Sequence, residues 1–153
     1  MRITLVAVGR VRDRHAEALC ADYAGRIPHF LPFSVAEVKD GRGLDPDKAK
    51  EAEGARILGQ LPDGCLPILL DEHGTRRTSI GLAEWIEGLT QETRDLRFVL
   101  GGAFGVDPTV KARAQGQLRL SDLTLPHELA RVLFLEQLYR ACTILRGTKY
   151  HHE

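Results

Sequence analysis

The sequence predicts an α/β fold with a mostly parallel sheet flanked by helices. Short apolar, β-branched runs alternate along the chain with helix-type periodicity, and glycine, proline or polar turns separate them. The 153 residues are enough for one domain with its own core, and the sequence contains no internal repeat. Because strands that alternate with helices usually pair in parallel, we expect a sheet with helices on both faces.

The first half of the chain predicts two strands and two helices. Residues 3–8 form a buried apolar run that ends at Gly9, and residues 33–38 resemble a second strand. Between them, residues 13–27 have helical spacing before Pro28. The apolar positions of that helix are Ala16, Leu19, Cys20, Tyr23 and Ile27. Pro46 suits the first turn of a second helix that we expect to reach about residue 61.

The second half predicts three more strands. The strand at residues 66–70 ends in a polar turn at residues 71–74, and Ser79 is a candidate N-cap for the helix that follows. Residues 96–100 form the fourth strand. Residues 116–120 form the fifth, after a short helix at residues 110–114. A long helix then begins at Pro126.

Composition narrows the class of protein. Charged residues make up 27% of the chain and the formal net charge is zero, which excludes a disordered chain and a generally basic nucleic-acid binder. Any contact with RNA must therefore come from a local patch. The three cysteines are widely spaced and match no metal or redox motif, so we expect reduced core thiols in a cytoplasmic protein. The sequence carries no apolar run of membrane-spanning length and no secretory leader, and we expect no membrane contact.

Three loops are the candidate site. Residues 70–74, 101–107 and 121–126 each follow a predicted strand, and ligands of open α/β sheets bind beyond the carboxyl ends of strands. Gly101 and Gly102 would allow a ligand close to the backbone, although a glycine turn is an equal alternative. Their spacing matches neither the dinucleotide fingerprint nor a phosphate-binding loop.

Polar residues interrupt the apolar pattern of the last predicted helix. His127 and Arg131 lie one turn apart near its N-terminus, where an anionic group would be favoured. Glu136 and Arg140 have the spacing of a structural ion pair. Because Arg131 and Arg140 are nine positions apart, they point about half a circle away from each other. One straight helix cannot bring both to one ligand.

The C-terminal tail is locally cationic. It contains Lys149, Tyr150, His151 and His152, and Tyr150 could stack on a base as well as donate a hydrogen bond. A frayed end is the ordinary alternative. A His-His-Glu metal site is the weaker one, because further ligands at metal spacing are missing from the sequence, and we expect no metal.

Five ordered segments carry a resemblance to a known family. They are 69–74 (LLDEHG), 98–105 (FVLGGAFG), 120–127 (LSDLTLPH), 131–140 (RVLFLEQLYR) and the terminal Tyr150-His151. Together with 5–9 (LVAVG) they resemble the large-subunit ribosomal RNA methyltransferases that act on N3 of a pseudouridine in 23S rRNA. The likeness spans nearly the whole chain.

The resemblance implies a SPOUT-type methyltransferase, an enzyme with S-adenosyl-L-methionine as cofactor. It implies one domain over residues 1–153 whose C-terminal trefoil knot and cofactor-binding part cover about 66–153. The residues alone favour an unknotted chain, because chains rarely thread loops. Family analogy further implies a homodimer, with 23S rRNA or the ribosome as partner. The residues leave open a nucleotide-binding module or an assembly factor without methyl transfer. They also leave open whether the substrate is free rRNA, the subunit or the ribosome.

Site residues follow from the resemblance together with the loops. The expected cofactor contacts are Leu70, Gly101, Gly102, Leu120, Ser121, Asp122, Leu123, Thr124 and Leu125. The polar candidates for catalysis are His127, Arg131, Arg140, Tyr150 and His151. In a dimer, Arg131 of one chain and Arg140 of the other could lie at the same site. The dimer would also bury apolar residues of the last helix that exceed one stripe, although we expect some of them to pack against the chain's own sheet instead. These residues are Leu129, Val132, Leu133, Leu135 and Leu138.

Overall fold

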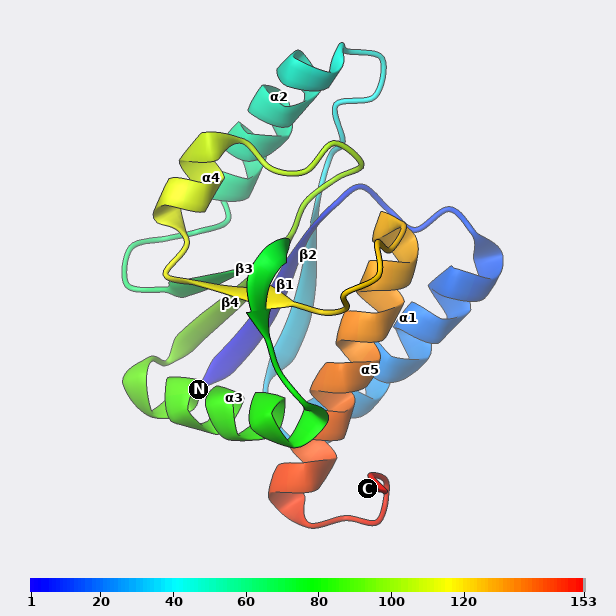
Figure 1. Cartoon of the computed structure of the whole chain (residues 1–153), viewed down its shortest axis with the longest axis vertical. Coiled ribbons are helices and arrows are strands. Elements are labelled where there is room, and N and C mark those ends of the chain that lie inside the picture. Colours follow the sequence, from blue (N-terminus) through cyan, green and yellow to red (C-terminus); the bar gives the residue numbers. More distant parts are fainter. Residues whose placement is uncertain (153) are drawn as a thin grey trace.

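A computed structural model describes residues 1–152 and confirms the predicted fold class (Figure 1). One parallel sheet has the strand order β2-β1-β4-β3-β5. Its strands are β1 (Arg2–Val8), β2 (Phe33–Val38), β3 (Leu66–Arg76), β4 (Asp95–Leu100) and β5 (Gly116–Arg119). The helices are α1 (Arg14–Arg26), the 3-10 turn η1 (Ile27–His29), α2 (Pro46–Leu58), α3 (Ser79–Glu92), α4 (Pro108–Arg113) and α5 (His127–Arg146).

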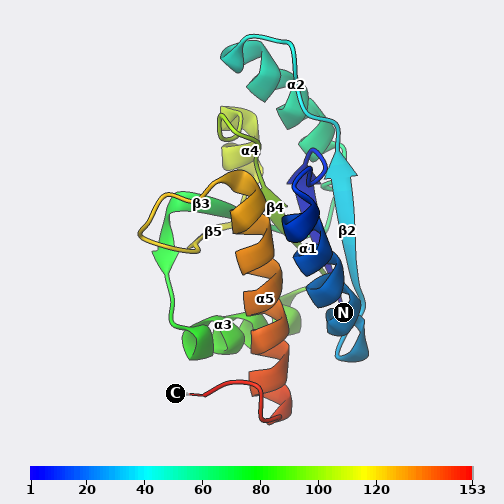
Figure 2. The same cartoon turned by 90° about the vertical axis from the view of Figure 1, so that its right-hand side faces the viewer.

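The central strands bury both of their faces. Along β1, Ile3 and Leu5 face the core that α1, α3 and α5 cover, whereas Val6 and Val8 face the core beneath α2 and α4. In Figure 2, α5 runs along the molecule and packs against both α1 and α3. Burial on both sides explains why these strands read as continuous apolar runs rather than as alternating ones. The three cysteines are buried, as expected.

Several element boundaries differ from the prediction. The N-cap of α3 is Thr78, whose hydroxyl accepts a hydrogen bond from the Gly81 amide, so the prediction of Ser79 was wrong. The Ser79 hydroxyl instead donates to Gln137 on α5 at 2.7 Å. The second helix ends at Leu58 rather than near residue 61. Leu19 of α1 is exposed, because that helix covers the core with Ala16 and Cys20.

The largest correction concerns β3, which does not stop at Leu70. It continues to Arg76, and Leu118 of β5 pairs with both Leu70 and Thr75, so residues 71–74 bulge out of the strand. The predicted polar turn is therefore an interruption within β3. In Figure 1 the end of β3 passes in front of the segment that carries β5 toward α5. This crossing brings the bulge of β3 and the loop after β5 together.

Candidate functional site

A cavity of about 530 Å³ lies where the bulge of β3 at residues 71–74 meets the loops that follow β4 and β5. The predicted cofactor contacts in its wall are Leu70, Gly101, Gly102, Leu120, Ser121, Leu123, Thr124 and Leu125. The parallel sheet explains this convergence, because the carboxyl ends of neighbouring strands lie along one edge. The volume falls in the range of small-molecule sites, about 300 to 1,000 Å³.

Asp122 belongs to the predicted contacts but lies outside this wall. Its carboxylate accepts hydrogen bonds from Arg76 at 2.7 Å and from Arg119 at 3.1 Å. The Arg76 guanidinium, followed by that of Arg119, holds the pKa of Asp122 below its usual value. Asp122 therefore ties the loop that follows β5 to the end of β3.

The glycine loop that follows β4 is both a tight turn and a place where the backbone lines the cavity. Gly105 has a φ of +84°, which requires a residue without a side chain, and its amide donates to the Gly102 carbonyl at 3.1 Å. Gly101 and Gly102 line the cavity with their backbone. A Cβ at Gly101 would lie 2.6 Å from a Val106 methyl group, within the loop itself. The turn and the close backbone approach are thus parts of one structure.

The cavity also has charged neighbours that the prediction did not include. Lys50 of α2 and Lys111 of α4 line it, and the Lys111 ammonium lies 3.9 Å from the Asp71 carboxylate. Asp71 and Lys111 lie in or beside predicted loops and could have been found from that position. Lys50 comes from the helix that was predicted from Pro46, and no feature of the sequence placed that helix beside the loops, so reasoning from the sequence missed Lys50.

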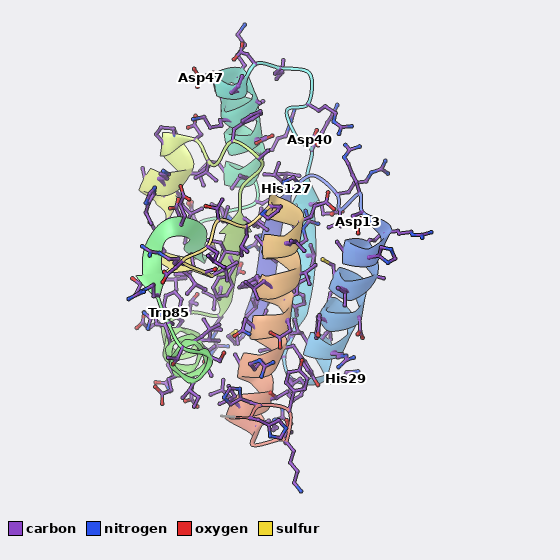
Figure 3. All side chains as sticks on the ribbon, turned by 45° about the vertical axis from the view of Figure 1, so that its right-hand side comes forward. Asp13, His29, Asp40, Asp47, Trp85 and His127 are labelled. Carbon is purple, nitrogen blue, oxygen red and sulfur yellow. The ribbon has the colours of Figure 1, made fainter. Side chains whose placement is uncertain are left out.

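His127 is the one predicted catalytic residue in the cavity wall. It is half-buried at the first position of α5, after Pro126, and Figure 3 shows it at the end of that helix. It also lines a second cavity, of about 410 Å³, formed with the loops that follow β1 and β2. His127 therefore stands between two hollows at the carboxyl edge of the sheet.

Arg131 lies one turn further along α5, but its guanidinium is buried against the protein. It donates to the Glu37 carboxylate on β2, and to the Gly9 carbonyl at 2.7 Å and the Val8 carbonyl at 3.3 Å. Only 4% of Arg131 is exposed. In this arrangement Arg131 fastens the end of β1 to α5 and does not face a ligand anion.

Arg140, Tyr150 and His151 form one cluster with Glu136. Arg140 Nε donates to Glu136 Oε1 at 3.0 Å, which is the expected ion pair, and its Nη1 lies 3.2 Å from His151 Nδ1. The Tyr150 hydroxyl donates to Glu136 at 3.1 Å, and its ring lies 4.9 Å from the Arg140 guanidinium. Burial raises the pKa of Tyr150, and the neighbouring Tyr23 and Glu136 raise it further. The described part of the tail is thus folded back onto α5.

This tail cluster lies far from the first cavity. His127 and Arg140 are 13 residues apart on one helix, which is about 20 Å at the rise of an α-helix. In Figures 1 and 2 the described tail leaves the end of α5 opposite the α2 and α4 side. One chain therefore does not bring the predicted catalytic residues together.

Two further observations concern metal binding and membrane-spanning helices. Within residues 1–152, no group of His, Cys, Asp and Glu side chains is arranged to hold a metal ion. No helix in the described part of the chain is long and apolar enough to cross a membrane.

Comparison with known proteins agrees with this geometry. A family model described as "Predicted SPOUT methyltransferase" matches residues 1–151. Two curated relatives, from Gloeobacter violaceus and Thiobacillus denitrificans, are both named "Ribosomal RNA large subunit methyltransferase H". The first is 47% identical over 152 residues, with 99% of each chain covered. The second is 43% identical over 156 aligned positions, with both chains covered completely.

Solved structures share the fold at low sequence identity. A probable methylase family protein from Haemophilus influenzae superposes with a TM-score of 0.57 at 15% identity, over 99% of this chain and 70% of that one. The SpoU methyltransferase AviRb from Streptomyces viridochromogenes, in complex with AdoMet, gives 0.50 at 11% identity, over 97% of this chain and 59% of that one. At these identities the likeness concerns the fold alone.

Proposed function

This chain belongs to the SPOUT methyltransferase family, and from that premise we propose that it methylates N3 of a pseudouridine in 23S rRNA, with S-adenosyl-L-methionine as methyl donor. The observation that carries the proposal is the convergence of three loops on one cavity whose wall contains all of the expected cofactor contacts except Asp122. The full-length relatives, named for the large ribosomal subunit RNA, support the choice of substrate. A ribosomal substrate implies a cytoplasmic enzyme.

The knot that is typical of SPOUT folds is assigned to residues 66–153 of a single domain. The crossing of β3 over β5 supports this assignment, because a Cβ on Gly74 would stand 2.7 Å from the Leu118 backbone. The close approach of these two backbone segments supports the assignment. The same crossing builds the cavity, so the knotted part and the cofactor-binding part coincide.

The residues of the first cavity suit the cofactor. Leu70, Leu100 and Leu120 supply apolar walls for an adenine ring, and the glycine backbone supplies hydrogen-bonding groups that no side chain covers. The hydroxyls of Ser121 and Thr124 lie in the same wall. When bound, the cofactor supplies an electrophilic methyl group on its sulfonium.

The side chains and backbone of the protein have only to position the base and assist the loss of its proton. They must hold the base with N3 toward the methyl group, exclude water and stabilise the ring as the N3 proton is lost. His127 is the candidate to accept that proton, because it is the titratable side chain at the boundary of both cavities. Arg140, Tyr150 and His151 are candidates for stabilising charge on the base.

A second copy of the chain completes this proposal. The tail cluster lies about 20 Å from His127 along α5, so it reaches a cavity only if that cavity belongs to a partner. Leu129 is 52% exposed, and Val132 and Leu133 are half-buried, which leaves an apolar surface on α5 for dimerisation. Leu135 and Leu138 were also expected there, but they are buried in the chain's own core.

The test of the activity uses ribosomes that lack the modification. The protein is incubated with methyl-labelled S-adenosyl-L-methionine and either free 23S rRNA, the large subunit or the assembled ribosome, and the labelled nucleotide is mapped. Label on N3 of one pseudouridine is the expected result. Cofactor binding without label on any of the three substrates would contradict the proposal and favour a binding module.

The shared site is tested by mixing two variants. One carries Gly101→Val and lacks a working cofactor loop, and the other ends at Thr148 and lacks the tail. Each should be inactive alone, whereas an equal mixture should regain about a quarter of the wild-type activity, because half of the dimers are mixed and hold one intact site. A truncated variant with full activity would show that the tail takes no part.

A further inference from the structure

The second cavity is not used by the proposed cofactor. It lies beside the first and shares four wall residues with it, Gly102, Ala103, Phe104 and His127. Its other walls come from the loops after β1 and β2 and from α2. In Figure 3, Asp40 and His127, which both line it, lie on neighbouring segments at one end of the molecule. A group held there would adjoin the first cavity across the glycine loop.

The wall of this cavity, which Glu128 of α5 completes, carries three arginines and three carboxylates, those of Asp40, Glu53 and Glu128. Arg10, Arg12 and Arg42 line it and are exposed. Arg12 faces Asp40 at 3.6 Å, whereas Arg10 and Arg42 form no ion pair with any residue between 1 and 152. Guanidinium groups without a carboxylate partner, at the edge of a cavity, suit the phosphates of a nucleic acid.

The carboxylates beside these arginines accept hydrogen bonds from backbone amides, and Asp40, which faces Arg12, accepts from the Arg42 amide at 3.2 Å. The Asp13 carboxylate caps α1 by accepting from the amides of His15 and Ala16 at 3.0 and 2.9 Å. Glu128 accepts from the amides of Arg12 and Asp13, both at 3.1 Å. The bonds to Glu128 hold the loop that carries Arg10 and Arg12 against α5.

Phe104 is a large apolar side chain in an unusual place. It projects from the glycine loop at the boundary of the two cavities and is 54% exposed. An aromatic ring beside a cationic pocket is a common way to hold an unstacked RNA base. The ring could therefore fix a base at the point where the cavities meet.

Glu53 lies at the floor of the second cavity and is 5% exposed. Its Oε2 accepts from the Gly41 amide at 2.8 Å. Its Oε1 is buried and has no hydrogen-bond partner among the described residues. That oxygen faces the glycine loop, since a Cβ on Gly102 would stand 2.8 Å from it. A buried hydrogen-bond acceptor that lacks a donor destabilises the folded protein. A ligand that donates a hydrogen bond to Glu53 Oε1 would explain why the carboxylate is there.

We propose that the second cavity receives the nucleotide that is methylated, with its phosphates on Arg10 and Arg42, its base against Phe104 and one base N–H donated to Glu53. This inference rests on the proposed function. The base enters beside Gly102 and displaces that residue from the Glu53 oxygen. Of the two N–H groups of pseudouridine, N3–H is lost in the reaction and N1–H remains. Uridine has no N1–H because its N1 carries the sugar, so Glu53 would select pseudouridine.

The phosphate contacts are tested with a dye-labelled RNA hairpin that carries pseudouridine in its loop. Fluorescence anisotropy measures its affinity for the wild type, for Arg10→Ala/Arg42→Ala and for the control Arg94→Ala, an exposed arginine at the opposite edge of the sheet. The double variant should bind at least about tenfold more weakly and lower the salt slope by about 1.4, the value for two phosphates. An unchanged affinity and slope would overturn the proposal.

The base contact is tested with Glu53→Gln, which keeps an oxygen for the Gly41 amide. The control is Glu51→Gln, an exposed residue of the same helix. Wild type and control should prefer the pseudouridine hairpin over its uridine counterpart by about tenfold, and Glu53→Gln should lose that preference. A preserved preference would remove Glu53 from the site.

These binding results are separable from the methyl-transfer assay. If the wild type binds RNA through Arg10 and Arg42 but transfers no methyl group, the proposed function fails and the RNA site remains. If the wild type transfers methyl groups and the arginine variant has an unchanged KM for RNA, the proposed function remains and the second cavity is not the nucleotide site. Calorimetry should give the same affinity for S-adenosyl-L-methionine for the wild type and for the Arg10→Ala/Arg42→Ala variant.

Discussion

Gly74 lies so close to the backbone of Leu118 that a Cβ on Gly74 would stand 2.7 Å from the Leu118 carbonyl carbon and 2.8 Å from its amide nitrogen. The two residues belong to segments that are 44 positions apart in sequence and cross at this point. Pairing between β3 and β5 resumes at once, because Thr75 pairs with Leu118. The absence of one side chain thus allows the crossing that lies beside the first cavity.

Replacing Gly74 by alanine should destabilise the protein. The added methyl group would meet backbone atoms, which cannot rotate away as a side chain can, and overpacking of this kind costs about 1 to 3 kcal/mol. Urea denaturation measures the loss. The control is Gly88→Ala in α3, where a Cβ would meet nothing within 4 Å, and it should gain up to about 1 kcal/mol. Equal stability of the two variants would show that the crossing tolerates a side chain.

Gly101→Ala should weaken cofactor binding through the shape of its loop. The new Cβ would lie 2.6 Å from the Val106 methyl group and 3.2 Å from the Gly105 backbone, so the loop must shift where its backbone lines the cavity. We expect at least about a tenfold weaker affinity for S-adenosyl-L-methionine by calorimetry, because a shift of even one ångström disrupts a preorganised site. Gly25→Ala, in open space on α1, is the matched control. Unchanged affinity in a folded Gly101→Ala protein would count against this loop as a cofactor contact.

Arg131 and Glu37 should contribute unequally to stability. The Arg131 side chain is 5% exposed and donates to two carbonyl groups besides Glu37, whose side chain is 45% exposed. Arg131→Ala leaves buried carbonyl groups without a donor and should cost about 2 to 4 kcal/mol. Glu37→Gln should cost less, about 1 kcal/mol, because the glutamine amide oxygen can still accept from the Arg131 guanidinium and the two carbonyl bonds remain. Chemical denaturation of both variants decides between this reading and equal contributions.

Cys142 should make the protein sensitive to alkali. Burial raises the pKa of its thiol from 9.0 to about 11, against a smaller opposing effect of Arg146. The folded state therefore holds the thiol proton more tightly than the unfolded state does. This contribution to stability is complete below pH 9 and is lost as the pH rises toward 11.

The expected loss over that range is about 2 kcal/mol, and Cys142→Ala should lack it. The measurement is the urea midpoint of both proteins from pH 8 to pH 11. Parallel pH profiles for the two proteins would contradict the prediction. In the folded wild type, the same thiol should react with thiol reagents at pH 8 only as fast as the protein unfolds.

Local signals in the sequence were enough to predict the strand starts and the glycine loop. Apolar runs that end in Gly9 or in Gly101 mark where the chain leaves the sheet, and loops after parallel strands share one edge whatever their sequence. For this reason the three loops could be predicted to share one site, whereas the individual contacts in them were named from the family resemblance. Lys50 and Lys111 were not predicted, and Asp122 lies outside the cavity wall because its partners Arg76 and Arg119 depend on how β3 ends.

What the sequence could not reveal depends on contacts between distant segments. The end of β3 is decided by Leu118, and the partner of Arg131 is Glu37, which lies 94 positions earlier on another element. Helical spacing placed Arg131 on the same side as His127 but could not show that β2 supplies a carboxylate there. Thr78 and Ser79 are both suitable N-caps, and only the position of Gln137 separates them. The orphaned oxygen of Glu53 has no signature in the sequence.

The crossing of β3 over β5 also determines when the molecule becomes complete. A newly made chain exposes the bulge of β3 and the loop after β4 well before β5 and α5 have been synthesised. Contacts over such long stretches of sequence form slowly. Refolding should therefore be limited by the placement of residues 116–146. Until that step, the chain would expose the apolar face of the sheet that α5 finally covers.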